Sequence, residues 1–289
     1  MWFLYAITSA FGQATRFATS KKLTKNFSSI VVTWQMIAIS IPFVLLFTWQ
    51  YAGSIPLRDP KFIIITLIAS LCFTIGSLLM TKALEISPMS ATVPFLALTP
   101  LPAILIEFLI LGTVPTIYGT IGIIIVVIGS YMLNESERKY GFWEPIKAIK
   151  KEKGSIYAII TAFIFALGGI LDKYMINIAG AMPYLLMWTI SCTLTSTILL
   201  IFDKKPIKIL DQKNLKWIFL LGFLSFATNI SYNLAASLTN ASYALAIKRT
   251  SAIFSVLIGW LIFKELKIRD RMLGAIIMVL GVTMIALLG

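Results

Sequence analysis

The sequence contains no histidine, only two cysteines and few charged residues. The absence of histidine excludes every mechanism that needs an imidazole as a base or as a metal ligand. Cys72 and Cys192 both lie inside apolar stretches, so no disulfide framework is expected. Charged residues make up 13% of the chain and hydrophobic residues 58%, whereas soluble domains carry about 25% charged residues. A soluble domain of this size is therefore excluded.

The hydrophobic residues form long blocks, each close to the roughly 20 residues that a helix needs to cross a bilayer. Helices are expected because lipid cannot satisfy exposed backbone groups, and β-barrel strands would give shorter alternating blocks. The blocks are 2–20, 28–51, 62–83, 88–111 and 116–133, then 154–171, 183–202, 215–236, 240–263 and 268–288. They predict an all-α integral membrane protein of ten transmembrane helices. Its two five-helix halves, 1–133 and 154–289, are joined by a polar linker at 134–153.

The two halves repeat one another at an offset of 152 positions. The segment YAITSAF at 5–11 aligns with YAIITAF at 157–163, and Gly122 aligns with Gly274. Because each half has five helices, an odd number, the second half must enter the membrane upside down relative to the first. Inverted repeats around a central cavity place a binding site near the bilayer midplane and are typical of secondary transporters.

Lysine and arginine are distributed unevenly among the connections. One side carries most of them, including those of the linker 134–153, while the other carries Arg58, Lys61 and Lys173. Positively charged loops usually face the cytoplasm. We therefore expect a protein of the plasma or inner membrane with a cytoplasmic linker and with both termini outside. This placement accounts for the net charge of +13, so no nucleic-acid partner is expected beside the lipid bilayer.

The ends of the two halves resemble a known family. Residues 83–133, beginning ALEISPMSATVPF, and residues 235–287, beginning AASLTNASYALAIKRT, are similar to the end of an EamA-type repeat of the drug/metabolite transporter (DMT) superfamily. In that family an acidic residue and a Gly-containing last helix close each half. Glu265 and Gly274 fit this pattern, whereas Thr113 occupies the position of the acid in the first half. The resemblance covers essentially the whole chain. It implies ten helices around a cavity and secondary transport, often export of metabolites or amino acids. Enzymatic activity is not expected, because histidine and metal-ligand spacing are missing and the loops are very short.

Two adjacent basic residues, Lys248 and Arg249, lie about eight residues into the block 240–263, roughly 12 Å from its start. A charge at this depth is unfavourable unless it faces a cavity or a partner. The aligned residues of the first half, Leu96 and Ala97, carry no charge. The pair also resembles the dibasic pair that plastid phosphate translocators and nucleotide-sugar transporters of this superfamily use for anionic groups. We predict that it binds a carboxylate or phosphate of a small-molecule substrate.

Further polar residues inside the blocks are candidates for substrate contacts in the same cavity. They are Arg16, Trp34, Gln35, Asn229, Tyr232, Asn233 and Ser251. Ser251 shares a helical face with Lys248, whereas Arg249 points about 100° away from that face. Asn229 and Asn233 suit interhelical hydrogen bonds equally well. Snorkelling to the membrane surface is the alternative for Arg16, and interfacial anchoring is the alternative for Trp34.

Glu107 is the carboxylate clearly inside a block of the first half, and it is a candidate for proton coupling. The alternatives are surface exposure, since it lies about one turn from the block end, and an ion pair with Lys248 or Arg249. No Gly-rich loop ending in Gly-Lys-Ser/Thr occurs, so direct drive by ATP is not expected. No metal-ligand spacing is present either, and we expect no cofactor.

Glycines and prolines predict how the helices pack and bend. Glycines recur seven residues apart in the last block of each half, at Gly122, Gly129, Gly274 and Gly281, which favours close packing within the core or in a homodimer. Three prolines in the block 88–111 predict a kink there. The aligned block 240–263 has no proline, so the halves should differ in stiffness.

The leading hypothesis is a secondary transporter that works by alternating access and carries an anionic or zwitterionic metabolite. One alternative is an exporter of amino acids or drugs whose basic pair is structural and neutralised by Glu107. Another class remains as an alternative: a membrane protein that handles lipids through the basic pair, or an interaction protein whose charges contact a partner.

Overall fold

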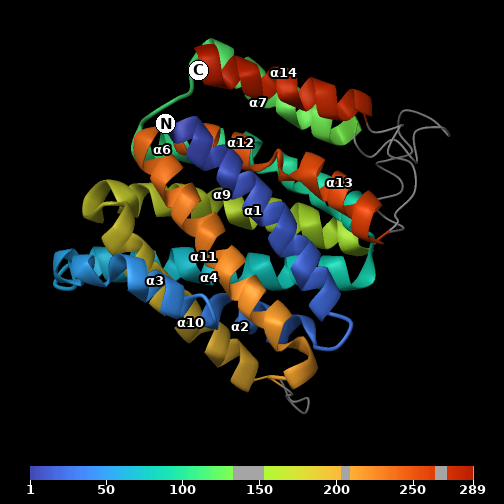
Figure 1. The fold of residues 1–289 in the computed structure, drawn as a ribbon. Coiled ribbons are helices and arrows are strands. Elements are labelled where there is room, and N and C mark those ends of the chain that lie inside the picture. The colour runs from blue at the N-terminus through green and yellow to red at the C-terminus, as the bar shows by residue number, and fades with distance from the viewer. Residues whose placement is uncertain (133–152, 203–208, 264–271, 289) are drawn as a thin grey trace.

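The computed structural model describes residues 1–132, 153–202, 209–263 and 272–288, and within these ranges the chain is helical without any strand (Figure 1). The elements of the first half are α1 (Trp2–Leu23), α2 (Ser29–Ala38), α3 (Ile41–Thr48), η1 (Trp49–Ser54), α4 (Pro60–Ile86), α5 (Met89–Thr92), η2 (Val93–Leu98), α6 (Pro100–Leu111) and α7 (Ile117–Met132). Those of the second half are α9 (Lys153–Ala179), α10 (Ala181–Ile201), η4 (Gln212–Asn214), α11 (Leu215–Leu238), α12 (Ala241–Lys248), α13 (Ser251–Phe263) and α14 (Met272–Leu288).

Length and hydropathy make this a multi-pass membrane protein. Among the described residues, 7 helical stretches are long and apolar enough to cross a bilayer, and α7 and α14 are shorter apolar helices. Large apolar side chains on the outer surfaces of these helices are exposed, as a lipid environment requires; Ile117, Leu261 and Leu280 are each at least 60% exposed. The linker predicted at 134–153 and the acid Glu265 lie outside the described residues, apart from Lys153 at the start of α9.

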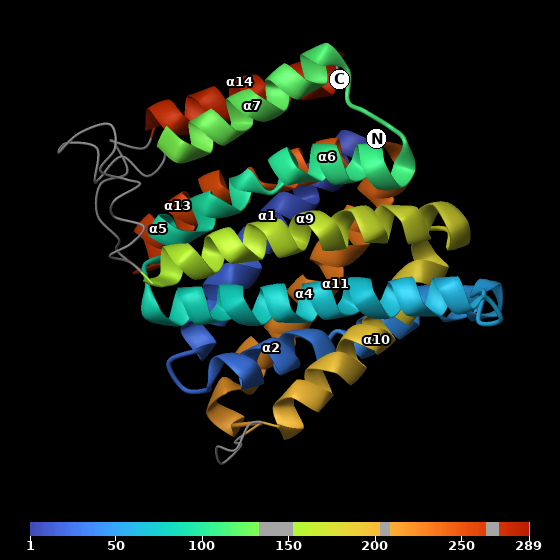
Figure 2. The same ribbon diagram turned by 180° about the vertical axis from the view of Figure 1, so that it is seen from behind.

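Three helix pairs dominate the packing. α1 lies along α11, α4 lies along α9, and α7 lies along α14 at one edge of the bundle (Figures 1 and 2). The glycines bring α7 and α14 into backbone contact, because a Cβ added to Gly129 would lie 2.6 Å from the backbone nitrogen of Met278. One added to Gly122 would lie 2.9 Å from the carbonyl oxygen of Gly281. The prediction that these glycines serve helix packing is confirmed, and a homodimer remains a prediction.

Both halves contain a helix that is interrupted near its middle. The predicted kink in the block 88–111 is confirmed, since η2 separates α5 from α6. The predicted contrast with the second half is wrong, because α12 ends at Lys248 and α13 starts at Ser251 without any proline. A threonine hydroxyl donates to the carbonyl three residues earlier at each interruption, Thr99 to Leu96 at 2.6 Å and Thr250 to Ile247 at 2.7 Å. Such bonds compete with the regular helical ladder and bend the chain.

The helix α9 extends further than the sequence block suggests. We predicted an end at residue 171, and α9 continues to Ala179, before Gly180 with its positive φ of 83°. Asp172 and Lys173 therefore lie inside a helix. The assignment of Lys173 to an external loop is wrong, and its ammonium group donates a 2.6 Å hydrogen bond to the carbonyl of Ala236 at the end of α11.

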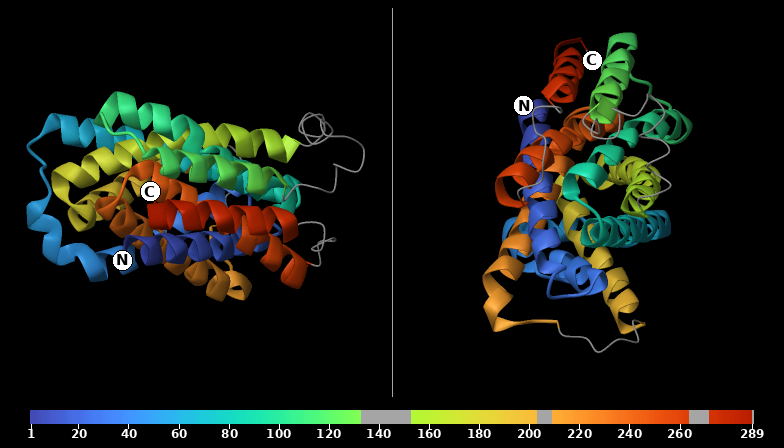
Figure 3. Two further views of the ribbon diagram at one scale, coloured as in Figure 1. Left: turned by 90° about the horizontal axis from the view of Figure 1, so that it is seen from above. Right: turned by 90° about the vertical axis from the view of Figure 1, so that its right-hand side faces the viewer.

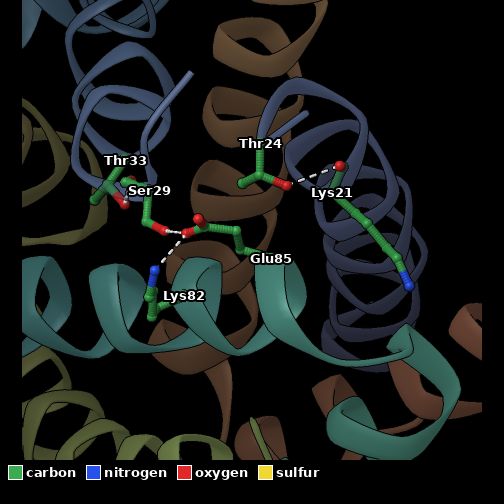
Figure 4. A network of polar contacts seen from close by, with 6 residues as sticks. All are labelled: Lys21, Thr24, Ser29, Thr33, Lys82 and Glu85. Carbon is green, nitrogen blue, oxygen red and sulfur yellow. Dashed lines mark hydrogen bonds and ion pairs between the residues drawn. The ribbon is translucent and has the colours of Figure 1, made fainter. Parts of the chain in front are cut away.

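A polar network fastens one end of the bundle (Figure 4). Glu85, near the end of α4, accepts hydrogen bonds from Lys82 at 3.0 Å and from Ser29 at the start of α2. Thr24 closes the end of α1 by donating to the carbonyl of Lys21 at 2.9 Å. The amino terminus and the end of α14 lie toward one end of the bundle (Figure 3). These contacts lie at the end of the bundle and are separate from the buried polar residues in its middle.

Candidate functional site

A cavity lies between the two halves, enclosed by six helices and by the interruption between α12 and α13. It contains about 500 Å³ of space not filled by atoms, including the part that is open to the outside. It is lined by Gln13 and Arg16 of α1, Phe73 of α4, Phe165, Gly168, Gly169 and Asp172 of α9, Trp188 of α10, Asn229, Tyr232 and Asn233 of α11, Leu245 and Lys248 of α12, and Arg249. Six predicted substrate contacts meet there: Arg16, Asn229, Tyr232, Asn233, Lys248 and Arg249.

The basic pair faces this cavity because α12 ends at it. Lys248 is 8% exposed and Arg249 is 2% exposed, and Arg249 is the C-cap of α12. We expected the two side chains to diverge by about 100°, and they contact the rings of different helices although both line the cavity. The ammonium group of Lys248 lies 4.1 Å from the ring centre of Tyr232, and the Arg249 guanidinium carbon lies 5.5 Å from that of Phe165. The carboxyl end of a helix also favours cations.

Arg16 is the third cation of the cavity and does not reach the protein surface. It is 2% exposed, and its guanidinium carbon lies 5.7 Å from the ring centre of Phe17 and 5.8 Å from that of Phe73. Its side chain is therefore held among aromatic rings inside the bundle, and snorkelling does not explain its position.

The guanidinium groups of the cavity are short of acceptors. The Nε and Nη1 atoms of both Arg16 and Arg249, and both amide atoms of Gln13, are buried without a hydrogen-bond partner among the described residues. Within the same part of the chain no carboxylate lies within 4.0 Å of Arg16, Lys248 or Arg249. A buried cation without a partner is strongly unfavourable. The cavity is therefore complementary to a group that accepts several hydrogen bonds and carries negative charge.

Asp172 is a cavity residue that the sequence did not reveal. Its carboxylate is 9% exposed and accepts a 2.5 Å hydrogen bond from the hydroxyl of Tyr184 on α10. We ended the predicted helix directly before this residue because a charge usually marks the end of an apolar block. The apolar residues that follow, up to the turn at Gly180, were the signal that the helix continues.

An aromatic wall forms another part of the lining that we did not predict. The rings of Phe73 and Phe165 stack with centres 6.0 Å apart, and Trp188 lies 4.6 Å from Phe73. Trp188 aligns with Trp34 when the repeat is shifted by two further residues, so the recurrence of tryptophan was a usable signal. The cavity thus combines a cationic region with an apolar one.

Glu107 is neither at the surface nor paired with the basic residues. It is 0% exposed, and its two carboxylate oxygens accept hydrogen bonds from the backbone nitrogens of Ala241 at 2.8 Å and Ser242 at 3.0 Å. The predicted alternatives of surface exposure and of an ion pair with Lys248 or Arg249 are therefore wrong. Glu107 of α6 caps the amino terminus of α12 and so ties the first half to the second.

The remaining predicted residues lie outside the cavity lining. Trp34 donates a 2.9 Å hydrogen bond to Thr197, and the side-chain amide of Gln35 donates a 2.6 Å bond to the carbonyl of Ile209. These contacts join α2 to α10 and to the segment after it. The hydroxyl of Ser251 is buried without a partner in the described chain. A direct contact of Trp34, Gln35 or Ser251 with substrate stays a prediction.

Metal binding has no support in the described residues, where no three His, Cys, Asp or Glu side chains come together.

The chain is similar to known proteins over its whole length. A family model described as "EamA-like transporter family" matches residues 1–135 and 152–287. Among solved structures 28 chains match, and one of them, titled "Crystal structure of protein", superposes with a TM-score of 0.76. That match covers 99% of this chain and 96% of the other at 15% sequence identity, so it shows a common fold. The comparison with curated proteins gave no match.

Proposed function

The chain belongs to the EamA-like transporter family, and on this basis we propose that it is a secondary transporter whose cavity binds an anionic or zwitterionic small molecule. The transport class follows from the family. The cargo, its binding residues and the alternating-access mechanism are inferred from the cavity.

The observation that carries the proposal is the imbalance of charge in the cavity. Arg16, Lys248 and Arg249 line it, and Asp172 is the single carboxylate in the described lining, which leaves a formal charge of 3 − 1 = +2. The guanidinium Nε and Nη1 atoms have no partner among described residues. Arginine presents its donors in a fork that matches carboxylate and phosphate oxygens. A cargo with such a group would compensate both the charge and the missing hydrogen bonds.

The cavity also suits a cargo that carries an apolar part beside its charged group. Asn229 and Asn233 add amide donors and acceptors, while Phe73, Phe165 and Trp188 offer aromatic surface. A lipophilic cation fits poorly, because it would meet uncompensated positive charge. The alternative of a structural basic pair neutralised by Glu107 loses support, since both carboxylate oxygens of Glu107 bind the backbone of α12.

The helix packing supports ten membrane crossings arranged as two inverted five-helix repeats. Shifting the first half by 152 positions exchanges the pair α1–α11 with the pair α9–α4 and maps α7–α14 onto itself. The interruptions at Thr99 and at Thr250 also fall at nearly aligned positions. Two such repeats can rock against each other around a fixed midplane site. This arrangement would expose the cavity to each side of the membrane in turn.

The proposal is tested by measuring the thermal stability of the detergent-purified protein with succinate, glucose 6-phosphate, glycine and tetraphenylphosphonium. A ligand that binds only the folded state stabilises it by about 2.7 kcal/mol at 100 times Kd. We expect stabilisation by succinate or the sugar phosphate that is lost in Lys248→Gln/Arg249→Gln. The matched control, Lys213→Gln/Lys216→Gln, removes the same charge from exposed positions and should keep it. Stabilisation by the cation alone would overturn the proposal.

The orientation is a separate part of the proposal. The bias of lysine and arginine supports a cytoplasmic linker and external termini in the plasma or inner membrane. Labelling of a single cysteine added at the amino terminus with a membrane-impermeant reagent in intact cells should succeed. Labelling only after the cells are opened would reverse the orientation.

A further inference from the structure

Asp172 sits where its charge must influence any anion in the cavity. It is the only carboxylate in the described lining, beside three cations that serve as the proposed anion site. It makes no ion pair within 4.0 Å with any of them in the described chain, and its recorded partner is the hydroxyl of Tyr184. The carboxylate is thus held at the site by a neutral group, while its negative charge partly offsets the positive charge of the cavity.

An incoming anion and the Asp172 carboxylate would oppose each other. Both are attracted by the positive charge that lines the cavity, that of Lys248 in particular for Asp172, and they repel one another. Protonation of Asp172 removes this repulsion. The hydrogen bond with Tyr184 can persist, because a protonated carboxyl can still accept from the tyrosine hydroxyl or can donate to it. Anion binding and proton binding should therefore favour each other, and by linkage each must do so to the same extent.

We propose that Asp172 is the internal counter-ion of the cavity, and that an anionic cargo binds together with one proton that Asp172 takes up from water. This inference rests on the proposed anion site. It makes Asp172 a determinant of affinity and makes the proton the coupling ion. It also replaces Glu107 in the coupling role predicted from the sequence, since both oxygens of Glu107 are engaged by the backbone of α12.

Among the other titratable groups around Asp172, Lys248 is the rival proton acceptor. Its titratable and charged neighbours on the surrounding helices are Tyr184 and Cys192 of α10, Cys72 of α4, Tyr232 of α11, Lys248 of α12, and Arg16 and Arg249 across the cavity. The tyrosines, thiols and arginines already carry their protons at neutral pH. Lys173, next in the chain, is bonded to Ala236 at the end of α11. Asp172 and Lys248 are thus the groups that can gain a proton when an anion arrives, and Asp172→Asn distinguishes between them.

The test uses anions that keep their charge over the pH range, sulfate and methanesulfonate, with the intact purified protein. Calorimetry in two buffers of different ionisation enthalpy counts the protons taken up per anion bound. We expect net proton uptake by the wild type at mildly alkaline pH, where Asp172 is ionised before the anion binds, and none by Asp172→Asn. At alkaline pH, Asp172→Asn should bind the anion about 30-fold more tightly, from Coulomb repulsion across about 8 Å at an effective dielectric constant of about 20.

Two further variants keep the interpretation specific. Tyr184→Phe removes the hydroxyl that holds Asp172 but keeps the carboxylate, so proton uptake should persist. Glu85→Gln removes one negative charge at the end of α4, outside the cavity, and should behave as the wild type. If Asp172→Asn does not fold, Asp172→Ser takes its place, and if neither folds, the proton count of the wild type decides.

The outcomes separate this inference from the proposed function. Anion binding without proton uptake in the wild type, or equal uptake in wild type and Asp172→Asn, would overturn the role of Asp172 and leave the anion site in place. Failure of both anions to bind to the wild type and to Asp172→Asn would instead overturn the anion site itself, and the coupling with it.

Discussion

Replacing Glu107 with leucine should destabilise the protein strongly, although Glu107 does not line the cavity. Its carboxylate satisfies the backbone N–H groups of Ala241 and Ser242, and all three residues are 0% exposed. Leaving a buried N–H group without an acceptor costs about 1–3 kcal/mol, so two such groups amount to roughly 2–6 kcal/mol. The lost interaction with the amino end of α12 adds about 0.3–1 kcal/mol. Glu107→Gln retains one acceptor, and we expect about half of the loss.

The assay is thermal unfolding in detergent at one heating rate, because membrane proteins commonly unfold irreversibly and the midpoint then depends on the rate. At about 2–4 °C per kcal/mol, a loss of about 2–7 kcal/mol in Glu107→Leu should lower the midpoint by roughly 5–28 °C. Glu85→Leu is the control, since its half-exposed pair with Lys82 and its hydrogen bond from Ser29 should each contribute at most about 1 kcal/mol. Wild-type stability of Glu107→Leu would refute the capping argument. Wild-type stability of Glu107→Gln with loss of pH-gradient-driven transport would restore the proton-coupling prediction.

Three other substitutions test individual contacts. Gly129→Val should lower stability by about 1–3 kcal/mol, because the new Cβ would lie 2.6 Å from the backbone nitrogen of Met278. The folded fraction should keep its anion affinity in a binding assay. Trp34→Phe removes the hydrogen bond to Thr197 and should cost about 1 kcal/mol in thermal unfolding without changing anion binding; weaker binding would bring Trp34 to the cargo. Ser251→Ala should leave stability unchanged or slightly higher, since the buried hydroxyl of Ser251 has no partner in the described residues. A loss of anion affinity would place Ser251 at the cargo, as its helical spacing from Lys248 predicts.

The sequence was sufficient for features that depend on the solvent and on short-range order. Lipid requires helices wherever the chain is apolar for about 20 residues, so the hydropathy blocks predicted where helices occur. The basic pair was conspicuous because Lys248 and Arg249 stand in an apolar block whose repeat partner is uncharged. The prolines predicted the interruption before α6, because a proline in the interior of a helix removes a helical hydrogen bond.

Features that depend on which helices meet could be recognised only in the tertiary structure. The interruption after Lys248 occurs without a proline, and the structure places Arg249 in the same cavity as Lys248 although the two face different helices. Asp172 looked like the end of a block, and it becomes a site residue because α9 continues and packs beside Tyr184 of α10.

The role of Glu107 was equally hidden, since its partners stand 134 and 135 positions further along the chain. A sequence states how polar a residue is and how deep in a helix it lies. Whether that residue meets cargo, backbone or another helix depends on contacts between distant segments. The chain by itself therefore determined a helical membrane protein built from a repeat, with buried charge. Tertiary packing decided which of those charges share one cavity and which of them hold the two halves together.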